Sequence, residues 1–264
     1  MSSLTDLFPP AWMITLYYLL TLICIVFGAK VSSVLLEGKR LQSNLCFLVL
    51  APLLSLRSWN RRRDLLGNEL FVIVLRGVLM TSLLAIIFIF LPPLTEEFPW
   101  WFRSYLAVFP FWLLVETVHI WFQFCWLVPG QFLPAINNRP ILSATVAEFW
   151  GVRWNRIFGD WLRHVCFQPL ARYSNKAVFI TLMVSALMHE MLVSIPLWLA
   201  YGVNCFGWML AYFFLQFMAI SLERKYLKNY PVLNRLFAWG AVLGPIPLIL
   251  NKGTLLIFHL AAMP

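Results

Sequence analysis

Residues 70–91 read LFVIVLRGVLMTSLLAIIFIFL, and Arg76 is the only charged side chain among them. A transmembrane helix needs about 20 mostly apolar residues, so this run can cross a bilayer once. Five further runs have a similar length and composition: Trp12–Ala29, Tyr105–Val128, Ala177–Tyr201, Cys205–Leu222 and Val232–Leu250. The sequence therefore predicts an all-α fold, a multi-pass transmembrane helical bundle with about 6–8 membrane segments.

The composition supports a membrane protein over a soluble one. Of the 264 residues 61% are hydrophobic and only 12% are charged, and the mean hydropathy is +0.79. Soluble domains are typically about 45–50% apolar and about 25% charged. This small number of charged side chains cannot cover a water-facing surface. We therefore expect the excess apolar side chains to face lipid. We expect residues 1–264 to form a single membrane-embedded domain.

Two apolar runs are too short to span comfortably, Leu45–Leu56 and Thr254–Met263. Basic residues flank Leu45–Leu56 on both sides, so we expect it to enter the membrane and return; the sequence leaves open whether Thr254–Met263 crosses. Basic loops alternate with nearly uncharged ones, which predicts a cytoplasmic loop 129–176 and an exoplasmic N-terminus. No cleavable signal peptide is evident, so we interpret the first run as a signal anchor.

The charge and the motifs exclude several functions. The net charge of +9 lies in short loops, as expected for membrane topology, so we predict no nucleic-acid partner. The five cysteines show no C-x-x-C spacing, and His189-Glu190 lacks the second histidine of H-E-x-x-H, so no metal site is predicted. No serine lies in a G-x-S-x-G elbow.

Residues 148–165 show the pattern of an interfacial amphipathic helix. At about 100° per residue, the apolar face would hold Trp150, Trp154, Ile157, Phe158, Trp161 and Val165, and the opposite face Arg153, Arg156, Asp160 and Arg163. Tryptophan opposite arginine is typical of helices that lie at the membrane surface. Simple anchoring of the loop is the alternative, but it does not explain Asn155 and His164.

Ionisable side chains within apolar runs are costly in a bilayer and are functional candidates for that reason. His189 and Glu190 are adjacent in one run, and Gln216 lies in the next. Glu116, His119 and Gln123 share the i, i+3, i+7 spacing of one helical face in another. Structural hydrogen bonds between helices are the alternative explanation for each group, and we interpret Arg76 as structural.

Three segments together resemble the membrane-bound O-acyltransferase (MBOAT) family: Glu148-Phe-Trp-Gly-Val-Arg-Trp-Asn155, Trp161-Leu-Arg-His164 and Ser185-Ala-Leu-Met-His-Glu190. The nearest branch looks like wax synthases, diacylglycerol acyltransferases and sterol acyltransferases. Its F-Y-x-D-W-W-N motif is matched by Phe149, Trp154 and Asn155, with Trp150 in place of Tyr. Val152 and Arg153 depart from the motif, in a form closer to wax synthases. The later S-A-x-x-H-E motif is matched in full.

The resemblance implies transfer of a fatty acyl group from acyl-CoA to a lipid-soluble hydroxyl acceptor, namely a long-chain alcohol, diacylglycerol or sterol. The product would be a neutral lipid ester such as a wax ester, and acyl-CoA would be a co-substrate with no further cofactor. His189 would act as general base, and Asn155 would lie beside the thioester. Residues 177–250 would form the core catalytic spans. The expected substrate-binding residues are Trp150, Arg153, Trp154, Arg163, His164, Glu190, Gln216, Glu116 and His119.

Two other functions stay open at this stage. A transporter could use Glu116, His119, His189 and Glu190 as a proton relay, although no internal repeat supports it. A catalytically inactive scaffold is the second, and the intact Asn155 and His189 argue against it. The expected location is the endoplasmic reticulum of a eukaryote or the inner or plasma membrane of a bacterium. Besides acyl-CoA, the acceptor and membrane lipids, a homo-oligomer remains open.

Overall fold

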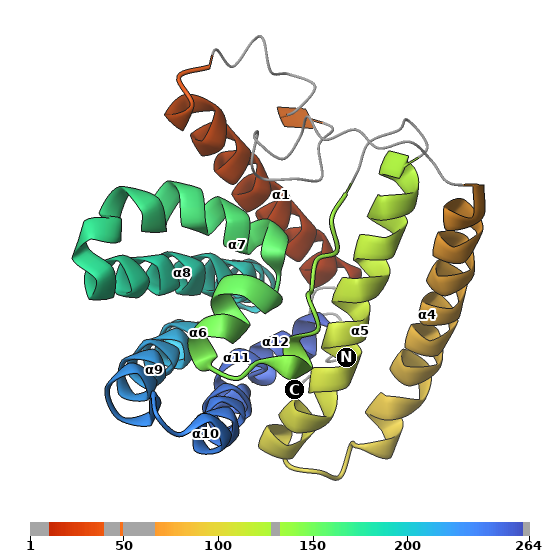
Figure 1. Cartoon of the computed structure of the whole chain (residues 1–264). Coiled ribbons are helices and arrows are strands. Elements are labelled where there is room, and N and C mark those ends of the chain that lie inside the picture. Colours follow the sequence, from red (N-terminus) through yellow and green to blue (C-terminus); the bar gives the residue numbers. More distant parts are fainter. Residues whose placement is uncertain (1–10, 40–47, 50–66, 128–132, 261–264) are drawn as a thin grey trace.

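The computed structural model describes residues 11–39, 48–49, 67–127 and 133–260, and within these ranges the chain is helical with no strand (Figure 1). Five segments of the described part are long and apolar enough to cross a membrane. They lie in α1 (Ala11–Leu36), α4 (Gly67–Leu94), α5 (Trp100–Leu127), α8 (Ser174–Tyr201), and α10 (Pro231–Leu243) with α11 (Ile246–Ile249). The predicted all-α, multi-pass bundle is confirmed.

The sixth predicted run, Cys205–Leu222, forms a shorter helix than expected. The helix α9 (Trp208–Leu222) has 15 residues, which rise about 22 Å against an apolar bilayer core of about 30 Å. It begins after Gly207, and α8 ends just before Gly202; both glycines have positive φ, at 110° and 65°. These two residues shape the turn of an α8–α9 hairpin, and a π-helical turn, η7 (Glu223–Leu227), extends α9.

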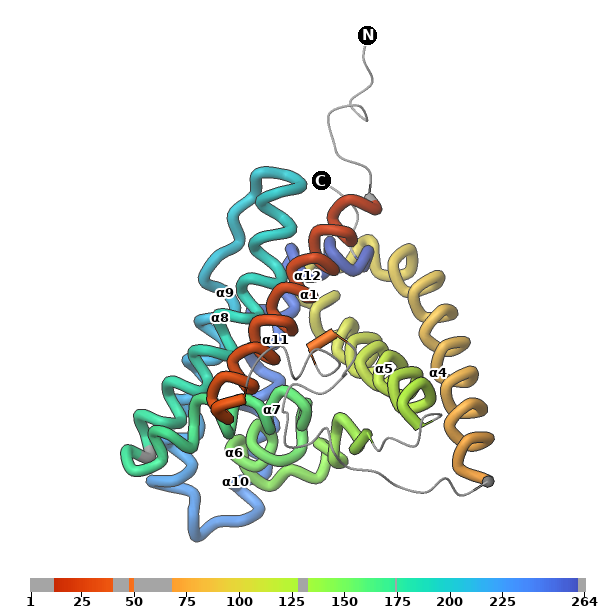
Figure 2. Tube along the Cα trace, turned by 90° about the horizontal axis from the view of Figure 1, so that it is seen from above, coloured from red at the N-terminus to blue at the C-terminus, as the bar shows by residue number. Residues whose placement is uncertain are grey.

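Helices pack in neighbouring pairs, with α4 against α5, α1 along α8, and α8 against α9 (Figure 2). The short helix α12 (Lys252–Ile257) contacts α1, α5 and α8, and so connects α5 with the pair formed by α1 and α8. Gly253 permits this approach, since a Cβ there would lie 2.3 Å from Leu197 Cδ1. The run Thr254–Met263 thus contributes the last four residues of this helix, of which Thr254, Leu255 and Ile257 are buried.

Hydrogen bonds between segments far apart in sequence connect the helices at each end of the bundle. At one end, Ser104 Oγ donates to the Leu250 carbonyl at 2.6 Å, near the start of α5. At the other end, Trp161 Nε1 donates to the Ala29 carbonyl of α1 at 2.9 Å. The described part of the 129–176 loop therefore lies with the C-terminal half of α1, in agreement with the predicted alternation. The Leu45–Leu56 run lies outside the described residues, apart from Leu48 and Val49.

The predicted single amphipathic helix over 148–165 is wrong, because the backbone breaks in its middle. Helix α6 (Val146–Glu148) runs into the π-helix η4 (Phe149–Arg153), and α7 (Arg156–Leu162) into the π-helix η5 (Arg163–Phe167). Trp154 is extended at ψ 136°, and Asn155 is left-handed at φ 41° and ψ 59°. Trp150 and Trp161 consequently contact different helices, α9 and α1.

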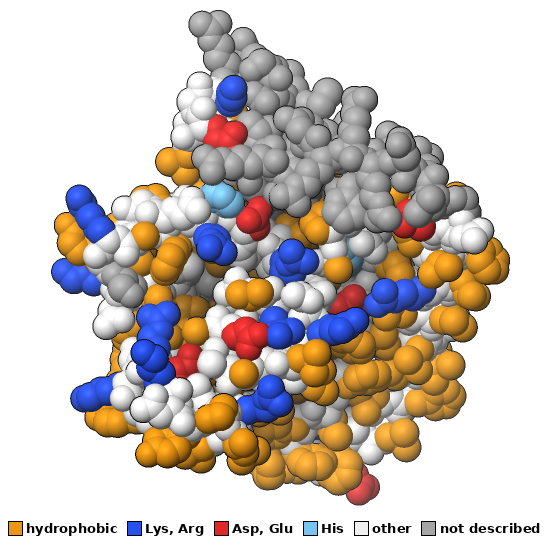
Figure 3. All heavy atoms as spheres, viewed as in Figure 1, with side chains coloured by type: hydrophobic (Ala, Val, Ile, Leu, Met, Phe, Trp, Pro, Cys, Tyr) orange, Lys and Arg blue, Asp and Glu red, His pale blue; other side chains and the backbone are white. Residues whose placement is uncertain are grey.

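Two short 3₁₀ segments complete the region, η3 (Pro140–Leu142) before α6 and η6 (Gln168–Tyr173) leading into α8. Charged side chains of both signs gather across the middle of the face that carries α6 and α7 (Figure 3). Large apolar side chains are exposed along α4, among them Phe71, Leu79 and Ile89. This distribution suits a bundle whose helices face lipid while one end meets water.

We expect the α8–α9 turn and the α9–α10 turn to lie on opposite sides of the membrane. Single cysteines at Asn204 and at Lys228, in a variant without the five native cysteines, should react with a membrane-impermeant maleimide from opposite sides of sealed vesicles. Both positions are exposed. Labelling of both from the same side would contradict this arrangement of α9.

Candidate functional site

His189 lies on α8, and among the described residues only one of its ring nitrogens has a hydrogen-bond partner. Nδ1 is 2.8 Å from the carbonyl of Ser185, one turn earlier. A carbonyl can only accept, so we assign the proton of the neutral ring to Nδ1, which leaves a lone pair on Nε2. Nε2 makes no hydrogen bond within the described ranges. The half-buried imidazole can therefore accept a proton from a bound molecule.

A chain of aromatic rings connects His189 to the first motif. The imidazole packs against Phe213 of α9 at 5.1 Å between ring centroids, and Phe213 packs against Trp150 at 5.2 Å. Trp150 contacts Phe149 edge to face, and Phe149 stacks on Trp154 at 5.7 Å with planes 10° apart. Continuous packing thus joins His189, in the S-A-x-x-H-E motif, to Trp154, the residue before Asn155. These rings form an apolar wall that extends from His189 to Trp154.

Asn155 lies at the break between η4 and α7, and its side chain has a free donor. Its Oδ1 caps α7 by accepting from the Phe158 N–H at 3.4 Å, a long hydrogen bond. Nδ2 makes no hydrogen bond to the described residues. An asparagine tolerates the left-handed backbone better than most residues. The capping oxygen fixes the amide, and the amide N–H₂ is available to donate to a bound group.

The polar face of α5 holds the segment Leu133–Asn137. Asn137 Nδ2 donates to Glu116 Oε1 at 2.9 Å, and Gln123 Nε2 donates to the Leu133 carbonyl at 3.0 Å. His119 lies between these contacts beside the Pro134 backbone, and its Nε2 is buried without a partner in the described chain. The predicted shared face is confirmed, and the contacts attach the loop to α5.

Glu190 is fully buried, and its carboxylate binds protein groups on both oxygens. Oε1 accepts from Ser194 Oγ at 3.0 Å, while Oε2 accepts from the backbone N–H groups of Met209 and Leu210 at 3.1 and 3.2 Å. Those N–H groups are at the positive N-terminal end of α9 and have no partner within the helix. The structure places Glu190 as the anchor of the α8–α9 hairpin, where substrate binding was expected.

Gln216 is also fully buried and joins three elements. Its Oε1 accepts from Trp150 Nε1 at 3.1 Å, and its Nε2 donates to the Ala241 carbonyl of α10 at 2.8 Å. Both ends of the amide are therefore used within the protein. Gln216 orients the Trp150 ring beside Phe213, and so acts on the surroundings of His189 through its neighbours.

Arg153 is bound inside the loop, which makes it a poor phosphate ligand. Its guanidinium contacts Glu148 Oε1 through Nε at 2.7 Å and through Nη2 at 2.6 Å. Nη1 donates to the carbonyls of Asn138 and Arg139. Arg163, in contrast, is exposed and has no ion pair in the described chain. His164 bonds the Asp160 carbonyl through Nδ1 at 2.7 Å, a local contact one turn away.

Two carboxylates that sequence reasoning missed hold the start of α6. Glu223 is buried, and its oxygens accept from the N–H groups of Val146 at 2.7 Å and Ala147 at 3.0 Å. Burial raises the pKa of Glu223, while these two hydrogen bonds oppose that rise. Glu148 accepts from the Ala144 N–H, and Thr145 Oγ1 accepts from the Glu148 N–H. The Thr145-x-x-Glu148 spacing is a sequence signal of such a cap, whereas Glu223 could be found only in three dimensions.

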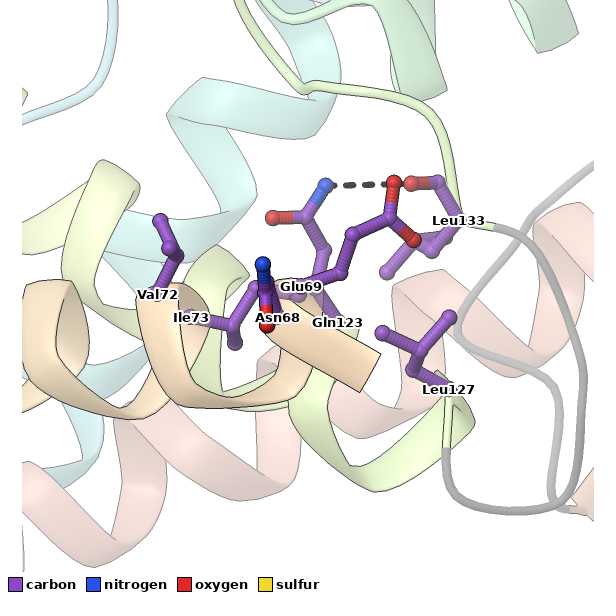
Figure 4. A pocket seen from close by; sticks show the side chains of 7 residues that line it. All are labelled: Asn68, Glu69, Val72, Ile73, Gln123, Leu127 and Leu133. Carbon is purple, nitrogen blue, oxygen red and sulfur yellow. Dashed lines mark hydrogen bonds between the residues drawn. The ribbon is translucent and has the colours of Figure 1, made fainter. Parts of the chain in front are cut away.

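A cavity of about 340 Å³ lies away from the two motifs, between the C-terminal half of α5 and the start of α4 (Figure 4). Its lining residues are Asn68, Glu69, Val72, Ile73, Gln123, Leu127 and Leu133. None of them is among the residues predicted to bind substrate or to act in catalysis. Within the described ranges, no group of three or more His, Cys, Asp or Glu side chains has metal-binding geometry.

The sequence model described as "Membrane bound O-acyl transferase family" matches residues 133–215, about a third of the chain. The matched region contains both motifs, with Asn155 and His189, and ends one residue before Gln216. The match supports membership of that family, as the resemblance predicts, but does not distinguish its branches. Among curated proteins, none matches the chain. Together with the five apolar helices, the match indicates an integral membrane protein.

Replacing Glu190 should destabilise the α8–α9 hairpin. We expect Glu190→Gln to remove the negative charge that faces the N-terminal end of α9 and to lower the free energy of unfolding by about 1–2 kcal/mol. Thermal unfolding of detergent-purified protein measures the effect. Glu97→Gln is the matched control, because Glu97 is exposed in the α4–α5 turn. Equal unfolding temperatures of the two variants would contradict the anchoring role.

Because of Glu148, the stability of the loop should fall at acid pH. The Ala144 N–H and, after it, Arg153 hold the pKa of Glu148 below its ordinary value, although burial opposes them. A lowered pKa in the folded state gives stability above the ordinary carboxyl pKa of about 4.3 that is lost as pH falls further. In thermal unfolding, we expect the stability of Glu148→Gln to fall less at acid pH than the stability of wild type. Glu223 is the same in both proteins. Parallel profiles would contradict the assignment.

Proposed function

We propose that this protein is a membrane O-acyltransferase that transfers a fatty acyl group from acyl-CoA to the hydroxyl of a lipid-soluble acceptor. The acceptor class is a long-chain alcohol, diacylglycerol or sterol, and the product is a neutral lipid ester such as a wax ester. One observation carries the proposal: the Ser185 carbonyl engages Nδ1 of His189 and leaves Nε2 as a proton acceptor beside an apolar aromatic wall.

In the proposed reaction, Nε2 takes the hydroxyl proton as the acceptor oxygen attacks the thioester carbonyl carbon. The carbon–sulfur bond then breaks, and the imidazolium returns the proton to the departing CoA thiolate. The products are the ester and CoA, and the imidazole is neutral again. General base catalysis of this kind typically contributes about 10²–10⁴-fold in rate. An apolar site favours transfer to the acceptor because it keeps out the water that would hydrolyse the thioester.

The free Nδ2 of Asn155 is the proposed donor toward the thioester carbonyl oxygen, where negative charge develops during attack. Arg163 is the proposed contact for the CoA phosphates, because it is exposed and without an ion pair in the described chain. Arg153 does not keep this role, since its donors are used by Glu148 and by two carbonyls. Trp150 and Trp154 belong to the aromatic wall, and we propose that they line the region that binds the acyl chain.

A proton relay for transport has no support in the observed contacts. Both Glu190 oxygens are hydrogen-bonded to protein groups at the start of α9 and to Ser194. Glu116 holds Asn137, and it lies 3.8 Å from Arg76 in an ion pair. The residues of the presumed relay are thus divided between two separate structural networks.

Replacing His189 should remove turnover and keep the fold. We expect His189→Asn to lower ester formation from palmitoyl-CoA and hexadecanol by about 10²–10⁴-fold, since a general base is lost. The same change at His259, an exposed residue near Thr15 with a left-handed backbone that asparagine tolerates, is the matched control. Specific activity and thermal unfolding are measured on the same purified samples.

Near-normal turnover by folded His189→Asn protein would overturn the catalytic assignment. A loss of activity that only follows a loss of folded protein would identify His189 as a structural residue. Lipid analysis after expression in a host without neutral-lipid acyltransferases identifies the acceptor, because only the accepted alcohol class yields a new ester.

A further inference from the structure

The backbone around Asn155 is held by the segment 136–138. The Asn155 N–H donates to Asn137 Oδ1 at 2.8 Å. On either side of this bond, the Arg156 N–H donates to the Ile136 carbonyl at 2.7 Å and the Asn138 N–H donates to the Arg153 carbonyl at 2.7 Å. These three hydrogen bonds surround the left-handed residue. The conformation of Asn155 therefore depends on where segment 136–138 lies.

Segment 136–138 is in turn fixed to the membrane helix α5 through one side chain. Asn137 is 9% exposed, and its Nδ2 donates to Glu116 Oε1 at 2.9 Å. A carboxylate can only accept, so it requires Nδ2 of Asn137 to face Glu116 and Oδ1 to face the Asn155 N–H. Arg76 of α4 lies 3.8 Å from the other Glu116 oxygen. Glu116 and the Asn155 N–H thus hold the Asn137 amide from its two ends.

We propose that Glu116 and Asn137 are positioning residues for Asn155, so that a carboxylate in α5 holds the catalytic amide in place through one intervening amide. The inference rests on the proposed function, because it presumes that Nδ2 of Asn155 contacts the substrate. Glu116 and Asn137 do not touch the substrate themselves. Their effect is on the rate of the reaction more than on the affinity for acyl-CoA.

The pair can be tested by exchanging its charge. Glu116→Gln keeps a carbonyl acceptor for Nδ2 of Asn137 but removes the charge that strengthens this hydrogen bond. Asn137→Asp places two carboxylates face to face. We expect Asn137→Asp to lower kcat with palmitoyl-CoA and hexadecanol by roughly 10-fold to 100-fold and Glu116→Gln to lower it less, each with little change in KM.

The double variant Glu116→Gln with Asn137→Asp restores the pattern, because the amide at 116 donates to the carboxylate at 137, which accepts the Asn155 N–H. We expect it to recover most of the turnover that Asn137→Asp loses. A double variant no better than the worse single variant would overturn the proposal. Thermal unfolding of all variants shows whether a loss of kcat exceeds any loss of folded protein.

Asn155→Gly separates positioning from general stability. Glycine takes the left-handed φ without strain, so this variant removes the amide and keeps the backbone N–H. Because no amide remains to be positioned, Asn137→Asp should cause no further loss of kcat in the Asn155→Gly background. A full additional loss there would overturn the proposal in favour of a purely structural role.

The same series distinguishes failure of this inference from failure of the proposed function. Wild-type turnover by Asn155→Gly would remove the role of Asn155 in catalysis and the positioning with it. A defect in Asn155→Gly, together with normal kcat in Glu116→Gln and Asn137→Asp, would overturn the positioning alone. Hydrogen exchange at residues 153–158 gives a readout without turnover: it should rise in Asn137→Asp and fall back in the double variant, and unchanged exchange would overturn the proposal.

Discussion

Carboxylates that bind the N-terminal ends of neighbouring helices determine how this bundle is assembled. In a bilayer, backbone groups without a partner inside the protein are costly, and helix ends carry several of them. Glu190 satisfies two N–H groups at the start of α9, and Glu223, just after α9, satisfies two at the start of α6. The helices α8, α9 and α6 are thereby linked in sequence. Phe213 and Gln216 of α9 reach His189 and Trp150 because of this linkage.

The motif around Asn155 depends on a similar transfer of polar contacts from a membrane helix to a loop. Glu116 binds Asn137, and Asn137 binds the backbone of Asn155, so the loop conformation is set by a residue of α5. Such buried networks stabilise one arrangement only when every member is paired. Here the pairing is nearly complete around the motifs, while His189 Nε2 and Asn155 Nδ2 have no partner in the described residues. These two atoms are the ones that the proposed chemistry requires.

Sequence reasoning identified polar residues correctly but gave several of them a substrate where the structure gives them a protein partner. Glu190, Gln216, Glu116 and Arg153 were all expected to bind substrate, and each has its polar atoms used within the fold. The reason is that a buried polar side chain signals a necessary partner, and the sequence does not say whether that partner is protein or ligand. The break at Asn155 was missed for a related reason, since helical periodicity over 148–165 cannot show hydrogen bonds from residues 136–138.

The sequence by itself determined that this chain crosses a membrane as a helical bundle, because runs of about 20 apolar residues have no other stable solution in lipid. It also determined which residue types make up the candidate site, through the Asn155 and His189 motifs and their order along the chain. Only the tertiary structure decided that α9 is a short helix anchored by Glu190, and that Trp150 and Trp161 point to different helices. Those outcomes depend on hydrogen bonds between residues far apart in sequence, which local periodicity does not encode.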